Sequence, residues 1–204
     1  MDINIFNKIY KLHKKKLKYL SVPHKKLLIC FSGIPGSGKT HIAKILEEKY
    51  KGVRINNDNI RKIISELISE KTAKDTKEAE KKRENILDKY LIWLLENNLF
   101  NNGLIILDSS IDRKYKEIFL IAKENRFDLF VVRIIVSREI AEKRAIERHG
   151  GTDVHFVSNI NRWIKENEEF NYKVKTGITI WNNTVLNLNS LFEKLEKLLR
   201  EAKR

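Results

Sequence analysis

Residues 33–40 have the residue types and spacing of a loop that binds phosphate groups. They read Gly-Ile-Pro-Gly-Ser-Gly-Lys-Thr: two glycines separated by four residues, then lysine and threonine. Glycines let such a loop curl so that its backbone N–H groups point inward at phosphate oxygens. The lysine can reach the β- and γ-phosphates of a nucleotide, and the threonine hydroxyl can bind Mg²⁺. We therefore predict that Mg²⁺ is bound by Thr40 and that ATP is bound by Gly33, Pro35, Gly36, Ser37, Gly38, Lys39 and Thr40.

An aspartate that follows an apolar run is the second candidate for metal binding. Asp108 ends the run Leu104–Leu107, and we predict that it holds Mg²⁺ with Thr40, directly or through water. A simple cap is the alternative interpretation of this residue. Serines follow Asp108, where many motor-type ATPases have a water-activating glutamate, which argues against ATP hydrolysis as the main output. The Asn-Lys-x-Asp pattern that reads guanine is also missing from the later part of the chain.

Asp58 and Arg61 could serve the acceptor of a transferred phosphate. They follow the short apolar run 53–56 and stand three residues apart at an expected helix start, so they share a face. A carboxylate there can take the proton of an attacking hydroxyl, and an arginine can hold the acceptor or its phosphate. Alternatively, Asp58 caps the helix and Arg61 is solvated. Capping and catalysis are compatible, so a capping Asp58 could still take the proton of the acceptor hydroxyl.

A charged helix at 138–149 is the expected lid of the site, with the lid extending over about residues 138–155. Arg144 and Arg148 stand four residues apart on one face and could neutralise charge on the transferred phosphoryl group. A glycine pair at 150–151 offers a hinge. The alternative is a solvated helix whose glutamates pair with these arginines. In the loop 181–184 we expect Asn182 to contact the adenine.

All of these positions follow or join apolar runs that alternate with helical patterns. Strands are expected at 27–32, 53–56, 104–108, 129–136 and 177–181, and helices at 39–50, 58–70, 78–100, 113–126, 138–149, 154–169 and 189–203. Such alternation predicts a parallel sheet covered on both faces, with ligands at the carboxyl ends of the strands. The predicted fold is α/β: a three-layer P-loop NTPase fold with a five-stranded parallel sheet and a helical lid.

The loop and the acceptor-side residues together resemble one enzyme family. Residues 33–40 followed by Ile55-Asn56-x-Asp58-x-x-Arg61 are similar to the kinase domain of phage-type polynucleotide 5′-hydroxyl kinases. The resemblance implies that the aspartate is the general base and that the arginine steers the acceptor hydroxyl. It continues through Asp108-Ser109-Ser110 and the lid pattern Lys143-Arg144-x-x-x-Arg148-x-Gly150, so it covers about residues 27–150.

The chain departs from that family in three respects. Asn57 stands where the family tends to have a basic residue, Thr40 replaces serine, and no phosphatase domain is appended. A wider group, which includes zeta-toxin-like and small-molecule P-loop kinases, shares most of these features. The resemblance therefore indicates a kinase more firmly than it indicates a polynucleotide acceptor.

Charge and composition bear on the partner. The chain has 204 residues, 42% of them hydrophobic, and a formal net charge of +14, which attracts polyanions. Residues 1–26 carry eight lysines and one acid, and we expect them to form a basic helical extension before a kinase domain at 27–204. Its aromatic residues, Phe6, Tyr10 and Tyr19, could stack nucleic-acid bases or serve packing. The one cysteine excludes an intrachain disulfide.

Three functions remain open from the sequence. The leading hypothesis is an ATP-dependent kinase acting on the 5′-hydroxyl of RNA or DNA, and the alternative is a small-molecule kinase for a nucleoside, sugar, antibiotic or nucleotide-sugar. The third is a nucleotide-dependent switch or binding protein, for which Asp58 would be dispensable. We expect a cytoplasmic protein without a membrane partner, since no apolar run reaches membrane-spanning length and no signal peptide is recognisable.

Overall fold

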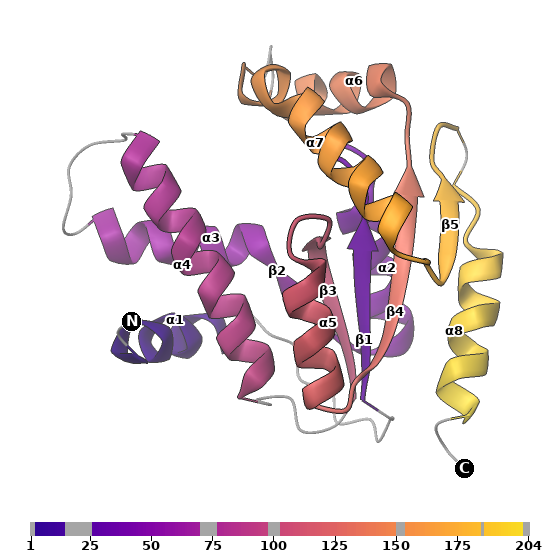
Figure 1. The fold of residues 1–204 in the computed structure, drawn as a ribbon, viewed down its shortest axis with the longest axis horizontal. Helices are drawn as coiled ribbons and strands as arrows, with labels where there is room; N and C mark the ends of the chain where they lie inside the picture. The colour runs from indigo at the N-terminus through magenta and orange to yellow at the C-terminus, as the bar shows by residue number, and fades with distance from the viewer. Residues whose placement is uncertain are drawn as a thin grey trace.

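The computed structural model describes residues 3–14, 26–69, 77–97, 103–149, 154–184 and 186–201. Within them, one parallel sheet has the strand order β2-β3-β1-β4-β5 (Figure 1). Its strands are β1 (Leu27–Ser32), β2 (Val53–Asn56), β3 (Leu104–Ser110), β4 (Asp128–Ile135) and β5 (Ile178–Trp181). Every residue of the central strand β1 is buried, as expected for a parallel strand covered on both faces. The predicted α/β fold with five parallel strands is confirmed.

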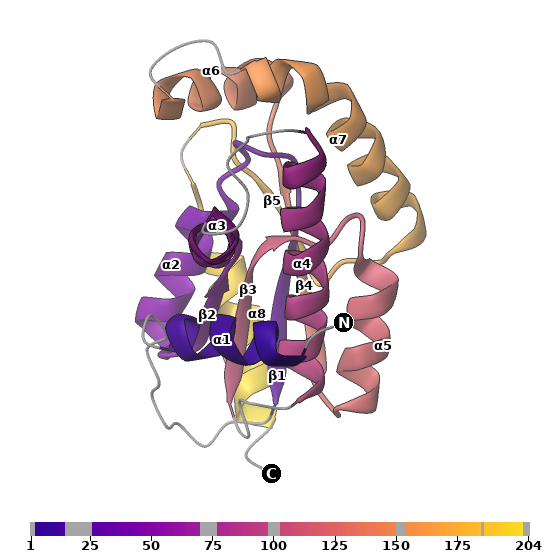
Figure 2. The same ribbon diagram turned by 90° about the vertical axis from the view of Figure 1, so that its left-hand side faces the viewer.

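Helices cover both faces of this sheet (Figures 1 and 2). On one face, α2 (Lys39–Tyr50) and α8 (Asn189–Glu201) form an apolar core with β1, β3, β4 and β5. On the other face, α4 (Lys77–Glu96) and α5 (Tyr115–Glu124) pack with α3 (Asn57–Ser69) in a second core. In α8, buried leucines recur every four residues, which is the spacing of one helix face: Leu191, Leu195 and Leu199.

The N-terminal helix α1 (Ile3–Lys14) belongs to the second core. Phe6 is buried, and its ring centroid lies 5.7 Å from that of Trp93 in α4; Tyr10 lies 6.1 Å from the same ring. Buried His13 makes a 3.1 Å hydrogen bond with the Tyr90 hydroxyl. Of the two expectations for Phe6 and Tyr10, packing is therefore the one observed. Tyr19 lies outside the described residues.

Two element starts differ from the sequence expectation in ways that affect the site. Helix α3 begins at Asn57, and the Asn56 side-chain oxygen accepts a 2.9 Å hydrogen bond from the Asn59 N–H. The capping role expected of Asp58 is thus wrong, because Asn56 performs it and Asp58 lies in the first turn. Helix α5 begins at Tyr115, later than expected, which leaves residues 112–114 in a turn.

Helices α6 (Arg138–His149) and α7 (Val154–Lys173) complete the fold, with α6 lying across the carboxyl end of the strands (Figures 1 and 2). They share a small apolar core with residues at the phosphate loop and the end of β4: Ile34, Val136, Ala141, Ala145, Phe156 and Ile160. The described part of the chain contains no helix long and apolar enough to cross a membrane.

Candidate functional site

The loop between β1 and α2 has a backbone that requires glycine. Gly36 and Gly38 adopt φ angles of 81° and 99°, in the left-handed region that other residues rarely enter. Space is also restricted, because a Cβ atom on Gly38 would lie 2.4 Å from the Asn182 side-chain nitrogen. On Gly36 it would lie 2.8 Å from the Ala141 carbonyl oxygen in α6. The loop is therefore held between the lid helix and the loop after β5.

Lys39 places its ammonium group inside this loop. The Nζ atom donates hydrogen bonds to the carbonyl oxygens of Gly33 (2.7 Å) and Ile34 (2.8 Å) and to the Ser37 hydroxyl (3.3 Å). Helix α2 starts at this lysine, and its N-cap residue, Gly38, has no side chain that could accept a hydrogen bond from the first-turn N–H groups. Its first-turn N–H groups and its positive dipole end therefore point at a site suited to an anion.

Asp108 is the centre of a hydrogen-bonded cluster beside the loop. Its Oδ1 accepts a 2.9 Å bond from the Thr40 hydroxyl, and its Oδ2 accepts bonds from Arg54 (2.7 Å) and the Asn56 amide (2.5 Å). Parallel pairing of β2 with β3 sets Asn56 opposite Asp108 and so brings these side chains together. Because Thr40 donates its hydrogen to Asp108, its oxygen lone pairs remain for a hard cation, so this oxygen-rich site fits Mg²⁺.

Arg54 joins the Asp108 cluster to helix α2. Its Nε donates a 2.8 Å hydrogen bond to Glu47, while its other contact is the ion pair with Asp108. Burial lowers the pKa of the Arg54 guanidinium, but its hydrogen bonds and charge interactions with Glu47 and Asp108 outweigh burial and raise the pKa overall. The guanidinium is therefore a fixed positive charge at the end of the sheet.

The acceptor-side residues lie at the start of α3. Arg61 donates hydrogen bonds to Asp58 (2.8 Å) and, from Nε, to Glu84 of α4 (2.7 Å). Burial lowers the pKa of Arg61, but its bonds and charge interactions with Glu84 and Asp58 raise the pKa overall. Burial raises the pKa of Glu84, and the Arg61 hydrogen bond and the nearby cations more than reverse this and lower it. Asp58 is exposed over 72% of its side chain.

A turn after β3 extends this charged cluster. Lys114 forms an ion pair with Asp88 of α4, and Arg113 lies 3.8 Å from the same carboxylate. The charges of both cations reach Glu84. The start of α3, the middle of α4 and the turn before α5 therefore form one surface of interleaved acids and bases.

Asp112 in the same turn is buried against the phosphate loop. Its Oδ2 accepts hydrogen bonds from the Gly33 backbone N–H (3.2 Å) and from Asn167 of α7 (2.7 Å). The same Asn167 nitrogen lies 2.9 Å from the Ser32 hydroxyl. The other oxygen of Asp112 is buried and has no hydrogen-bond partner among the residues that the structure describes. This network ties α7 to the first residue of the loop.

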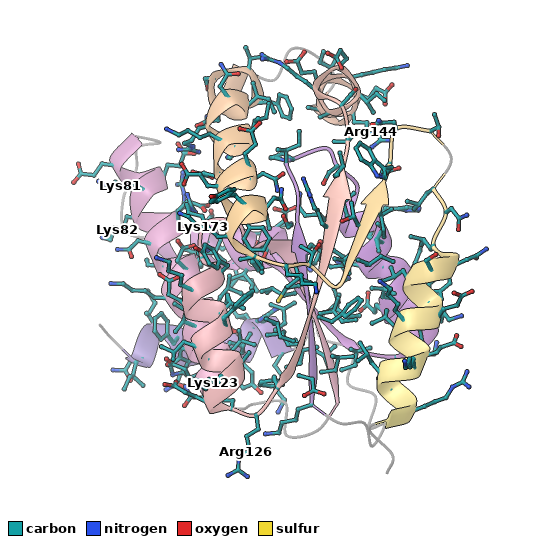
Figure 3. The ribbon with its side chains drawn as sticks, turned by 45° about the vertical axis from the view of Figure 1, so that its right-hand side comes forward. Lys81, Lys82, Lys123, Arg126, Arg144 and Lys173 are labelled. Atoms are coloured by element: carbon teal, nitrogen blue, oxygen red, sulfur yellow. The ribbon has the colours of Figure 1, made fainter. Side chains whose placement is uncertain are left out.

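The lid contacts the loop through an arginine. Arg144 donates hydrogen bonds to the carbonyl oxygens of Gly36 (3.2 Å) and Asn182 (3.0 Å), and it lies near the tip of β4 in Figure 3. The Asn182 side chain in turn donates a 2.8 Å bond to the Ser37 carbonyl. Arg144 and Asn182 thus both lie at the loop. The Arg148 side chain and the expected hinge at 150–151 are outside the described residues.

Comparisons with known proteins give a family for this chain and solved structures with the same fold. The sequence model of the family described as chromatin associated protein KTI12 matches residues 27–203. The chain belongs to the KTI12 family. A search of the curated proteins finds no match for the sequence. The finer resemblance to phage-type polynucleotide kinases is not confirmed and stays a prediction.

Solved structures share the fold of this KTI12-family chain. A protein of the PezAT toxin-antitoxin system of Streptococcus pneumoniae matches with a TM-score of 0.61 and 15% identity, over 100% of this chain and 97% of that one. A presumed kinase from Chloroflexus aurantiacus matches with a TM-score of 0.57 and 14% identity, over 86% of this chain and 99% of that one. These likenesses support the P-loop NTPase fold.

Sequence reasoning missed several polar residues of the site in this KTI12-family chain. Arg54, Asn56, Asp112 and Asn167 were not expected there, although the first three contact Asp108 or the loop and Asn167 contacts Asp112. An arginine within a four-residue buried strand and a second acid after β3 were available signals. Whether these two residues lie at the site depends on the strand order, because the order decides which strands are neighbours.

Proposed function

We propose that this KTI12-family chain is an ATP-dependent kinase that transfers the γ-phosphate to a hydroxyl group. One juxtaposition carries the proposal: the phosphate loop follows β1, the Asp58–Arg61 pair follows β2, and Asp108 lies near the carboxyl end of β3, the strand between them. Donor-side and acceptor-side groups therefore share the carboxyl edge of the sheet. A switch protein has no need for the acceptor-side pair.

The residues divide the reaction among them. The loop N–H groups and Lys39 bind the phosphates; Thr40 with Asp108 would hold Mg²⁺, which would neutralise charge on the phosphate oxygens. The acceptor oxygen attacks the γ-phosphorus while the bond to the β–γ bridging oxygen breaks and ADP leaves. Asp58 takes the proton of that hydroxyl, and Arg61 holds the acceptor. We assign stabilisation of the transferred phosphoryl group to Arg144 and Arg148.

The proposed acceptor is the 5′-hydroxyl of a polynucleotide. Support comes from the net charge of +14 and from exposed basic residues spread over the surface. Figure 3 shows Lys81 and Lys82 of α4 on the same flank as Lys173 of α7, with Lys123 and Arg126 at the far end of α5. On α1, Lys8, Lys11 and Lys14 are exposed. Such surfaces attract a phosphate backbone.

A small-molecule acceptor is the second candidate, and the acceptor-side cluster favours it. Three cations there stand against three carboxylates: Arg61, Arg113 and Lys114 with Asp58, Glu84 and Asp88. This balance leaves little positive charge at the acceptor position itself for a phosphate backbone. A neutral sugar or nucleoside would fit such a surface.

The proposed compartment is the cytosol, and the family description adds chromatin as the other candidate. Binding to a chromosomal polynucleotide would agree with the basic surface. Cell fractionation followed by detection of the protein distinguishes the two compartments.

Transfer assays test the function. Protein with γ-labelled ATP and Mg²⁺ is incubated with 5′-hydroxyl RNA, 5′-hydroxyl DNA and a panel of nucleosides and sugars. Label on an oligonucleotide supports the leading acceptor, and label only on a metabolite supports the second. Asp58→Asn should abolish transfer while keeping ATP binding, with Lys62→Ala as the matched control on the same helix. Binding of ATP without label on any acceptor, in wild type as in Asp58→Asn, would point to a switch.

A further inference from the structure

We propose that Arg54 is a positioning residue of the donor site, where it serves as an internal counter-ion for Asp108 and reduces the dependence of ATP binding on Mg²⁺. This inference rests on the proposed ATP binding by the loop. It assigns a role to a residue of β2 that is outside the phosphate loop and contacts Asp108 of the site.

Arg54 is held in one place by two partners on different elements. Its Nε bonds to Glu47 of α2 at 2.8 Å and one of its terminal nitrogens bonds to Asp108 of β3 at 2.7 Å. The side chains of Arg54, Glu47 and Asp108 are exposed over 15%, 17% and 1%. A largely covered guanidinium with charged partners on both sides has little freedom to leave.

Asp108 needs a cation because its other contacts are neutral. Beside Arg54 it accepts hydrogen bonds from the Thr40 hydroxyl and the Asn56 amide. Neutral donors satisfy the lone pairs of a buried carboxylate but do not offset its charge, and an unpaired buried charge is costly. With Arg54 present, an adjacent cation offsets the charge of the Asp108 carboxylate before any metal binds, although Arg54 is shared with Glu47.

This arrangement has a consequence for nucleotide binding. Metal-free ATP carries several negative charges, and an uncompensated Asp108 would repel them; Arg54 removes that repulsion. For Mg²⁺ the sign is opposite, because Arg54 repels the cation and masks the carboxylate that attracts it. Arg54 should therefore strengthen binding of metal-free ATP and weaken the additional gain that Mg²⁺ provides.

The test compares ATP dissociation constants with Mg²⁺ and with EDTA, measured by calorimetry on the whole chain. The readout is the ratio of the Kd in EDTA to the Kd in Mg²⁺. Arg54→Gln should raise this ratio by about tenfold, the order expected from one unit charge acting beyond contact distance. Arg54→Lys keeps the charge and should stay within about threefold of wild type.

Glu47→Gln is the matched control, because it removes the other partner of Arg54 and leaves the Arg54–Asp108 pair in place. Its ratio should not rise, because removal of a carboxylate changes the local charge in the opposite direction to removal of the Arg54 cation. Asp108→Asn should lower the ratio, since the positive charge then remains without its carboxylate. If Arg54→Gln does not fold, the Glu47→Gln/Arg54→Gln double variant removes one carboxylate with the cation and should still raise the ratio.

Two results separate failure of this inference from failure of the proposed function. Wild-type protein that binds no ATP under either condition would overturn the proposed function itself. Wild-type protein that binds ATP, with ratios equal in wild type and Arg54→Gln, would overturn only the role of Arg54. A lower melting temperature with an unchanged ratio would show that Arg54 is merely structural.

Discussion

Replacement of Gly38 by alanine tests whether the phosphate loop and the loop after β5 form one packed unit. The new Cβ atom would lie 2.4 Å from the Asn182 side-chain nitrogen, and the backbone would keep a φ of 99°. Both effects are present without any nucleotide. We therefore expect a loss of folding stability in the unliganded protein, besides any loss of phosphate binding.

The magnitude follows from two separate costs. Alanine in the left-handed region costs about 1–2 kcal/mol. Asn182 must also move away, which breaks its 2.8 Å hydrogen bond to the buried Ser37 carbonyl. A buried carbonyl without a partner costs about 1–3 kcal/mol. Gly38→Ala should thus lower the free energy of unfolding by about 3 kcal/mol, and urea denaturation measures this directly.

A double-mutant cycle with Asn182→Ala separates the two costs. Asn182→Ala alone loses only the hydrogen bond, and in the double variant the new methyl group meets no side chain. The double variant should therefore be about as stable as Gly38→Ala, with clear non-additivity. Strictly additive losses would show that the two residues do not touch in solution and would refute the packing.

Three further predictions concern stability. Lys51 holds a φ of 56° as the C-cap of α2, so Lys51→Gly should stabilise the protein by about 1 kcal/mol; an unchanged or lower melting temperature would contradict this. Phe6→Ala should lower the free energy of unfolding by about 3 kcal/mol, because Phe6 is buried. The exposed control Lys8→Ala should change it by less than about 0.5 kcal/mol. Similar urea midpoints for the two variants would exclude packing of α1 against the core. Although burial raises the pKa of Glu84, Arg61 lowers it below the ordinary 4.5. Glu84 therefore stabilises the fold above pH 4.5, and this contribution disappears as the pH falls through the lowered pKa. Glu84→Gln should flatten the pH dependence of the urea midpoint in this range, and a curve parallel to that of wild type would argue against the Arg61–Glu84 pair.

Local signals were sufficient to predict the sheet and the donor loop. Each strand is a short apolar run that ends near a glycine or polar residue, and a parallel strand buried on both faces requires such a run. The loop pattern at residues 33–40 fixes its own place between a strand and a helix. Asp58 and Arg61 could also be placed together, because three residues separate them on a helix.

Contacts between distant parts of the chain could not be predicted in this way. Arg54 reaches Asp108 because β2 is the neighbour of β3, and the sequence does not state which strands are neighbours. Asn167 contacts Asp112 across 55 positions, which depends on how α7 crosses the sheet. From the sequence, Phe6 and Tyr10 fit base stacking and internal packing equally well, and their contacts with Trp93 of α4 show packing.

The packing of α1 has a consequence for how this protein is divided and produced. The family match begins at residue 27, yet the rings of Tyr90 and Trp93 lie against Phe6 of α1. Expression of the matching segment alone would leave these aromatic rings of α4 uncovered, and exposed apolar patches of this kind promote aggregation. We therefore expect a segment that keeps α1 to remain more soluble than residues 27–204 alone, so α1 should be retained when the protein is shortened for expression.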